Sequence, residues 1–222
     1  RVWKKDGFVF DMGPSWYLMP EVFEHYFDNF DKEVKDFYEL IRLDPSYRIF
    51  FPESTLEISG KLEENLELFD RLEENGAEKL QKYLDQAQDK YEYLLDGLMY
   101  EDLSRILSMF NPKLMAAGWK LSILSNIDGL TKKYFDSERA RKILQYSIVF
   151  LGGNPKNTPA LYSMISHIDF NLGVWYPYGG LGKIVEALES LCNEYNVQIN
   201  TGVEVTSLNV EDKKIVSVDT TA

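Results

Sequence analysis

The sequence predicts an α/β (α+β) fold in which a sheet domain is interrupted by a mostly helical lobe. Three observations carry this prediction: strand-like runs near the N-terminal end, a long helical and acidic middle, and a strand–helix–strand return at the C-terminal end. A helical insertion within an α/β sheet gives this order of elements. We therefore assign residues 1–27 and 174–222 to one partial sheet domain and residues 28–173 to the helical lobe.

The first elements are short. Gly7-Phe8-Val9-Phe10-Asp11 predicts a buried strand. Met12-Gly13-Pro14-Ser15 predicts a tight turn, because glycine and proline supply the backbone angles that turns need. Residues 20–27 begin with proline, which suits the first turn of a helix. Two strand-like runs around Pro52-Glu53-Ser54 predict a β-hairpin over about 46–59.

The middle of the chain has helical periodicity. Apolar residues recur at spacings of three and four, which predicts a long amphipathic helix whose charged side faces water; they are Leu80, Tyr83, Leu84, Ala87, Tyr91, Leu94, Leu95 and Leu98. Further helices are expected up to Phe150, with breaks near Asn111-Pro112, Gly118 and Asp136-Ser137. After the stop at Gly152-Gly153, we expect Thr158 to cap the N-terminus of another helix and Pro159 to be its first residue.

The C-terminal part returns to strands. Val174-Trp175-Tyr176 predicts a strand, Pro177-Tyr178-Gly179-Gly180 a turn, and the residues from Leu181 to Tyr195 a helix with one apolar face. Cys192 lies on that face and is expected to belong to the core. Three strands are expected to end the chain, at Val197–Asn200, Val203–Leu208 and Ile215–Asp219, the last two forming a hairpin.

Composition excludes several classes of function. The net charge of −12 repels phosphate backbones and argues against nucleic-acid binding. The single cysteine permits no internal disulfide, which fits a protein of the reducing cytoplasm. The two histidines, His25 and His167, have no metal-ligand spacing, so we expect no metal site. No apolar run approaches the roughly 20 residues of a spanning helix, so we expect any membrane contact to be peripheral. The sequence starts at Arg1, and we interpret it as an internal part of a longer protein.

The glycine pair Gly179-Gly180 is the first candidate for a binding site. A phosphate-binding loop would need glycine where Pro177 stands and serine or threonine where Ile184 stands, so we reject it. Glycines between a strand and a helix do let the backbone approach a flat ligand, and the helix N-terminus offers N–H groups to negative charge. The alternative is a plain strand-to-helix turn.

Several motifs taken together resemble a known family. The residues 7–15 resemble the Gly-Phe-x-Phe-Asp-x-Gly-Pro-Thr/Ser stretch of carotenoid desaturases. Gly152-Gly153-Asn154-Pro155, Pro159-Ala160-Leu161-Tyr162-Ser163 and the residues 173–180 look like the centre of bacterial-type phytoene desaturases, in order and with similar gaps. This resemblance covers nearly the whole chain. The family's Gly-x-Gly-x-x-Gly segment is not in these 222 residues, and we expect them alone to be inactive.

The resemblance implies an FAD enzyme of the amine-oxidase-like group that desaturates a long isoprenoid such as phytoene. It implies that Gly13, Pro14 and Ser15 lie beside the flavin, that Gly179 and Gly180 pass over its ring system, and that Val205 meets the adenine end through its backbone. The sheet domain would then be part of an FAD/NAD(P)-binding domain. Flavin would take a hydride, and the protein would supply placement and a dry site.

We expect aromatic side chains, which make up 14% of the residues, to line the path along which the substrate binds. Candidates for a polyene tunnel are Trp16, Tyr17, Trp119, Tyr162 and Trp175, for each of which core packing is the alternative. A hydrophobic stretch over 103–115 is a candidate for the lipid interface, with ordinary helix packing as the alternative. No catalytic base can be chosen from the sequence. Other open functions are a carotenoid isomerase, saturase or end-group oxygenase, and a non-catalytic lipid-binding module. Oligomeric state is left open.

Overall fold

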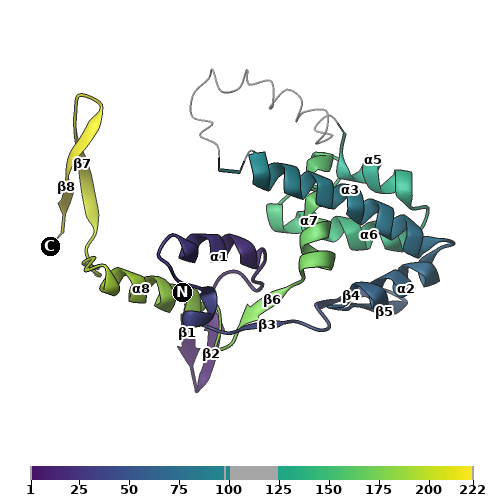
Figure 1. Ribbon diagram of the computed structural model, residues 1–222, viewed down its shortest axis with the longest axis horizontal. Coiled ribbons are helices and arrows are strands. Elements are labelled where there is room, and N and C mark those ends of the chain that lie inside the picture. Colours follow the sequence, from purple (N-terminus) through teal and green to yellow (C-terminus); the bar gives the residue numbers. More distant parts are fainter. Residues whose placement is uncertain (1, 98, 101–124, 222) are drawn as a thin grey trace.

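The computed structural model describes residues 2–97, 99–100 and 125–221. The described chain is extended, with a group of helices at one end and a long hairpin at the other (Figure 1). The helical group contains α2 (Leu62–Leu72), α3 (Gly76–Gly97), α5 (Ile127–Tyr134), α6 (Glu138–Gln145) and α7 (Met164–His167). Between the group and the hairpin lie α1 (Pro20–Asp28) and α8 (Gly182–Glu194).

Strands pair only as two-stranded ladders in the described part of the chain. Three are hairpins: β1 (Val2–Lys5) with β2 (Phe8–Asp11), β4 (Tyr47–Phe51) with β5 (Ser54–Ile58), and β7 (Val205–Glu211) with β8 (Lys214–Thr220). The fourth joins β3 (Leu40–Arg42) to β6 (Trp175–Pro177), from opposite ends of the sequence. Helices and strands are therefore mixed as expected, although these ladders do not merge into one sheet.

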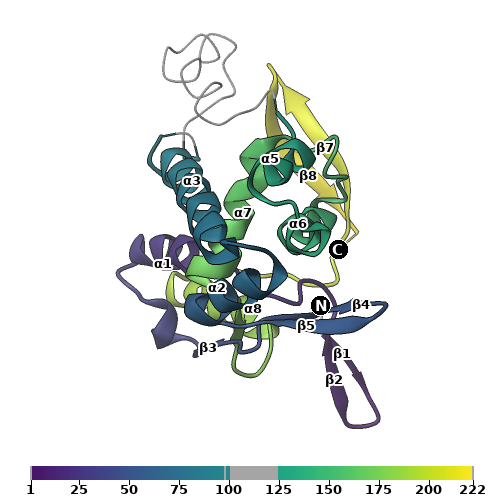
Figure 2. The same cartoon turned by 90° about the vertical axis from the view of Figure 1, so that its right-hand side faces the viewer.

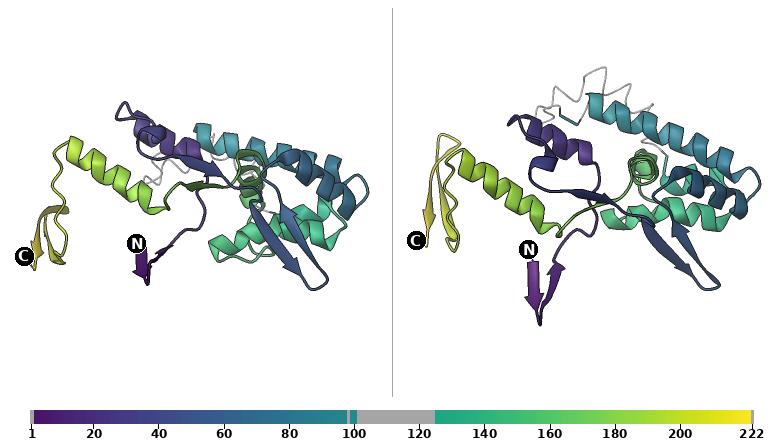
Figure 3. Two further views of the ribbon diagram at one scale, coloured as in Figure 1. Left: turned by 90° about the horizontal axis from the view of Figure 1, so that it is seen from below. Right: turned by 60° about the horizontal axis from the view of Figure 1, so that its bottom comes forward.

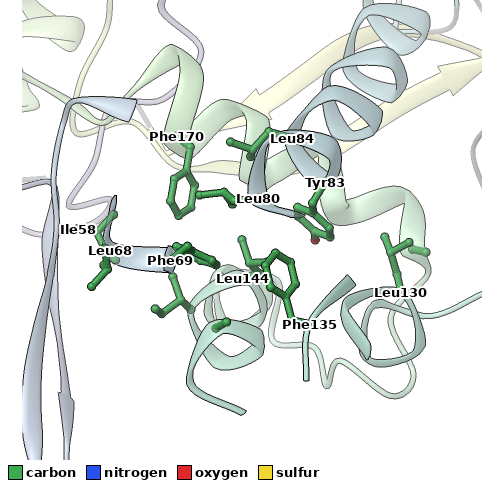
Figure 4. Packing of buried hydrophobic residues seen from close by; sticks show 13 residues of the cluster. Ile58, Leu68, Phe69, Leu80, Tyr83, Leu84, Leu130, Phe135, Leu144 and Phe170 are labelled. Carbon is green, nitrogen blue, oxygen red and sulfur yellow. The ribbon is translucent and has the colours of Figure 1, made fainter. Parts of the chain in front are cut away.

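The helical group surrounds a core of buried hydrophobic residues (Figure 4). The apolar face of α3 contributes Leu80, Tyr83 and Leu84, each with no measurable exposure, and α2 contributes the fully buried Phe69. Burial of this face is what the three-and-four spacing of the sequence predicts. Polar side chains cap α5 and α6: Asn126 accepts the Gly129 N–H at 2.7 Å, and the Ser137 hydroxyl accepts the Ala140 N–H at 3.3 Å.

A second cluster brings the N-terminal segment and α8 together. Its buried members are Tyr17, Phe27, Val34, Tyr38, Ala187 and Leu191. Tyr17 also forms an isolated antiparallel bridge with Trp175, with backbone hydrogen bonds of 2.8 and 3.0 Å. Packing of the two sequence-distant ends thus extends along the chain as far as Tyr38. The views from below show α1, β3 and β6 gathered between α8 and the helical group (Figure 3).

Some expected elements differ from the structure. β2 is a strand as predicted, but its side chains are largely exposed, because β1 and β2 stand out as a hairpin (Figure 2). A short apolar run predicts a strand, but it does not show whether other elements will bury that strand. Val197–Asn200 is not a strand and has no strand partner among the described residues. The last hairpin instead turns at Asp212 and Lys213, both with positive φ, in a two-residue turn.

Two predictions about helices, the cap at Thr158 and the burial of Cys192, were also wrong. Thr158 caps no helix: its hydroxyl donates to the Asn154 carbonyl at 2.9 Å, and Pro159 has the extended ψ of 144°. A 3₁₀ turn, Ala160–Ser163, follows instead and leads into α7. On α8, Leu191 is buried, whereas Cys192 is only half-buried and Val185 is 53% exposed. The apolar face of α8 is therefore covered over part of its width.

Candidate functional site

Asp11 joins the two ends of the chain at one point. One of its carboxylate oxygens, Oδ2, accepts the Tyr176 hydroxyl at 2.6 Å and the Leu181 N–H at 2.9 Å. These two hydrogen bonds, the Tyr176 bond first, lower the pKa of Asp11 below its ordinary value of 3.8. Asp11 ends β2, Tyr176 lies in β6 and Leu181 precedes α8, so a single carboxylate fixes the strand to the turn that carries the glycine pair.

Glycine is required in that turn. Gly179 and Gly180 have φ values of 90° and 99°, a backbone conformation that side chains disfavour. A Cβ on Gly180 would lie 3.0 Å from Asp11 Oδ2, and one on Gly179 would lie 3.0 Å from Lys183 Cε. The carboxylate also occupies the N-terminus of α8. The sequence predicted that N–H groups at this helix N-terminus are available to a ligand. The Leu181 N–H is instead bonded to Asp11 within the chain.

A pocket of about 440 Å³ opens beside this junction. It is lined from the N-terminal side by residues 11–14, 16–18 and Phe23, and from the C-terminal side by Leu181, Gly182, Ile184 and Val185. Most of these side chains are apolar. Volumes of roughly 300–1,000 Å³ with apolar walls and a few polar groups are typical of cofactor sites. The pocket therefore suits a largely apolar group that would meet Asp11 and the start of α8.

The residues expected to contact a cofactor are partly brought together. Gly13 and Pro14 line the pocket, Ser15 follows them on the exposed side, and Gly179-Gly180 directly precedes the lining residue Leu181. Val205 lies apart from them. It is 55% exposed on β7, beyond the far end of α8 (Figure 1).

The aromatic candidates for a substrate path are dispersed. Trp16 lines the pocket, and Tyr17 lines it while buried, with its hydroxyl 3.1 Å from that of Tyr38. Trp175 is half-buried beneath the Arg42 guanidinium, 5.8 Å from the ring centre. Tyr162 is half-buried in the 3₁₀ turn before α7 and does not line the pocket. Trp119 and the hydrophobic stretch 103–115 lie outside the described residues.

An aromatic cluster that sequence reasoning missed continues from Trp16. Its ring stacks on Tyr47 at 5.3 Å and meets Phe150 edge-on at 5.0 Å. Tyr146 packs between them, 4.6 Å from Tyr47 and 5.7 Å from Phe150. We call these four residues the aromatic wall. They come from three separate segments of the sequence, so no local pattern could have shown them as neighbours.

Asp11 was the other residue missed as a member of the site. It stands directly after a strand and two residues before Gly13, within the segment recognised for other reasons. A carboxylate at the end of a strand, next to a glycine turn, is a usable signal for a site of this kind.

Comparison with known proteins decides the family. The family model described as "Flavin containing amine oxidoreductase" matches residues 1–222. The chain belongs to this family. The match confirms the expected flavoprotein membership, and FAD is the cofactor that it implies.

Three curated relatives named as carotenoid, phytoene or diapophytoene desaturases are similar to this chain over almost its whole length. A carotenoid 3,4-desaturase of Haloarcula japonica is 42% identical over 92% of this chain. A zeta-carotene-forming phytoene desaturase of Myxococcus xanthus is 29% identical over 90%, and a 4,4'-diapophytoene desaturase of Staphylococcus aureus is 28% identical over 95%. The matched regions cover 42%, 39% and 42% of these relatives, so the chain spans about two fifths of their length.

The residues present fit one side of a flavin. The absence of a Cβ at Gly180 lets the Asp11 carboxylate approach the turn, and the pocket next to it has mostly apolar walls. Gly13 has no heavy atom within 4 Å of where its Cβ would stand, so its surface is open to an occupant. Within the described ranges, no helix has the length and apolar character needed to cross a membrane.

Proposed function

We propose that the full-length protein is an FAD-dependent desaturase acting on a long-chain isoprenoid, phytoene or a related carotenoid, in carotenoid biosynthesis. The observation that carries the proposal is the pocket in which the Gly13-Pro14 turn faces the start of α8 across Asp11. Family membership and the desaturase names of three relatives support it.

Under this proposal, the cofactor is held by backbone more than by side chains. Gly13, Pro14 and Ser15 would lie along one edge of the flavin, and Gly179 and Gly180 would pass over its rings. Val205 would meet the adenine end only together with parts of the protein outside the pocket. FAD, when bound, supplies the acceptor for the hydride that leaves the substrate. The chain's own contribution is to hold the turn in place through Asp11 and to exclude water with apolar side chains.

The polyene would run from the pocket along the aromatic wall. Trp16 belongs to both, which supports continuity between them. We assign Trp16 and Tyr17 to the substrate path and extend it to Tyr162 and Trp175. Aromatic faces suit a conjugated hydrocarbon because they offer large apolar contact area with little conformational entropy to lose.

The domain organisation proposed is a partial FAD-binding sheet domain from residues 1–27 and 174–222, with the lobe 28–173 covering the substrate. Packing of Val34 and Tyr38 against α8 supports close contact between lobe and domain. We also propose a cytoplasmic enzyme that associates peripherally with the membrane, where an apolar substrate dissolves. The number of subunits is left to measurement.

The test is product analysis with full-length protein. Purified protein reconstituted with FAD is incubated in liposomes with phytoene, and separately with an already desaturated carotenoid. New conjugated double bonds, seen as red-shifted absorbance and a loss of two hydrogens per step in mass spectra, are expected. A change of geometry without mass change would indicate an isomerase, gain of two hydrogens a saturase, gain of oxygen an oxygenase, and binding without conversion a lipid-binding module.

A further inference from the structure

A buried carboxyl group is hydrogen-bonded to the aromatic wall. Asp169 belongs to a π-helical turn, Ile168–Leu172, which continues α7. Such turns are rare and occur often at functional sites. The residue is 8% exposed, its Oδ2 accepts the Tyr47 hydroxyl at 2.6 Å, and its Oδ1 is buried without a hydrogen-bond partner among the described residues. An unpaired buried carboxyl oxygen is costly and calls for an explanation.

Tyr47 connects this carboxyl to the pocket. Its ring lies between Trp16, which lines the pocket, and Tyr146, and its hydroxyl points to Asp169. The Tyr146 hydroxyl is also buried, and it lies next to the Tyr47 hydroxyl. The aromatic wall thus includes a small group of buried oxygen atoms around the Tyr47 hydroxyl.

The surroundings of Asp169 favour its neutral form. Burial raises its pKa to about 7, opposed by the hydrogen bond from Tyr47. The titratable groups that face it are Tyr47 on β4 and Tyr146 after α6. His167, on the same helix, bonds to Asn171, and Lys90 on α3 bonds to Ala160 and Ser163. No ion pair to Asp169 is formed within the described residues, so no cation offsets its burial.

We propose that Tyr47 and Asp169 together receive the proton that the polyene loses during desaturation. After a hydride has left one carbon, the C–H bond on its neighbour breaks, its electron pair becomes the new double bond, and the proton passes to the Tyr47 oxygen. The Tyr47 hydroxyl proton moves at the same time to Asp169 Oδ2. Tyr47 ends neutral and Asp169 ends protonated, ready to release the proton when the product leaves. Tyr47 is the catalytic residue, and Asp169 acts through it.

This inference rests on the proposed function and deepens it by naming the proton acceptor. The test uses full-length enzyme with FAD and the variants Asp169→Asn and Tyr47→Phe. Two variants outside the aromatic wall are the matched controls. Glu73→Gln removes the charge of another largely buried carboxylate, which is paired with Lys79. Tyr134→Phe removes the hydroxyl of another tyrosine whose ring is packed against an aromatic neighbour. For the test variants we expect unchanged FAD content and KM and a kcat about 100-fold lower.

The pH profile separates this role from a structural one. The wild-type kcat is expected to rise with pH through about 7, as Asp169 loses its proton, and this rise should be absent in Asp169→Asn but present in both controls. Infrared difference spectra between pH 6 and 8 should show the carbonyl band of a protonated carboxyl that Asp169→Asn removes. A wild-type profile and kcat in Asp169→Asn, or no such band, would overturn the proposal. Wild-type protein that holds flavin, shows the band and converts no polyene would instead refute the proposed function and leave the proton-exchanging pair established.

Discussion

Asp11 and Tyr176 stand 165 positions apart in the sequence and share a hydrogen bond of 2.6 Å. The same carboxylate oxygen accepts the Leu181 N–H at the start of α8. This contact brings the Gly13-Pro14 turn and the start of α8 to one pocket. The other side chains of the β1–β2 hairpin are largely exposed, so this contact is a main attachment of β2 to the rest of the described chain.

Removing the Asp11 carboxylate should loosen the pocket. In full-length protein, we expect Asp11→Ala to lower FAD occupancy and to cost roughly 1 kcal/mol of stability, since two hydrogen bonds to a partly solvated carboxylate are lost. Bound flavin is measured by absorbance after gel filtration and stability by urea unfolding. Asp6→Asn, at an exposed turn position with positive φ, is the control. Undiminished FAD in Asp11→Ala would contradict the role given to this residue.

The same contact has a pH dependence of known sign. Hydrogen bonds lower the pKa of Asp11 in the folded state, so its stabilisation is present above 3.8 and is lost as pH falls through the lower folded-state value. The difference in unfolding free energy between wild type and Asp11→Ala should therefore shrink only under acid conditions. A difference that stays constant down to pH 2 would show that the carboxylate charge contributes nothing.

A methyl group on Gly180 should disturb the site through two effects. It would strain a backbone with φ of 99°, and it would approach Asp11 Oδ2 to 3.0 Å. Gly202→Ala provides the matched control, because Gly202 has φ of 73° but nothing within 4 Å of the added atom. We expect both variants to lose about 1 kcal/mol from strain, with FAD binding weakened in Gly180→Ala alone. Equal FAD affinity in the two would contradict the close approach.

Trp16 should control which products form. It contacts both the pocket and the aromatic wall, so Trp16→Leu should open the path and change the ratio of intermediates by several-fold without removing FAD. Trp3→Leu, on the exposed β1–β2 hairpin, is the control and should leave the ratio unchanged. Chromatography of the carotenoids formed by each variant measures the effect. The parallel variants Tyr162→Leu and Trp175→Leu test whether the path extends to those residues.

Asp169 should make the protein less stable as pH rises. Its folded-state pKa of about 7 exceeds the ordinary 3.8, so the folded protein keeps a proton that the unfolded chain has released. Stability from this group is present below about pH 4 and is lost as pH rises from 4 to 7. Asp169→Asn should therefore be more stable than wild type at pH 8 by roughly 2–4 kcal/mol, and by much less at pH 4. Urea unfolding at the two pH values measures this, and an equal difference at both would contradict the raised pKa.

Much of the local structure followed from the sequence because local patterns determine it. The face of α3, the Pro20 start of α1 and the β4–β5 hairpin each depend on spacing or on turn residues within a few positions. The glycine turn before α8 was also expected, and its positive φ values explain why glycine stands there.

The parts that could not be predicted depend on long-range contacts. The sequence around Asp11 does not indicate a hydrogen bond with Tyr176, and the sequence around Asp169 does not indicate one with Tyr47. The buried Lys90 likewise lies on a helix whose other charges face water as predicted, and its contacts are with Ala160 and Ser163 far along the chain. Burial of a polar group is a property of the tertiary structure, which periodicity does not report.

The most direct test of the flavin site is to fill the pocket at Gly13 in the full-length protein. Gly13→Trp places its Cβ where no heavy atom lies within 4 Å, and its ring would extend from the open surface of the turn, so we expect folding to persist. Bound FAD per chain, measured by absorbance on the purified protein together with its melting temperature, is the decisive quantity. We predict one flavin per chain in the wild type and none in Gly13→Trp at a nearly unchanged melting temperature. Full flavin content in Gly13→Trp would contradict a cofactor site between the Gly13-Pro14 turn and α8.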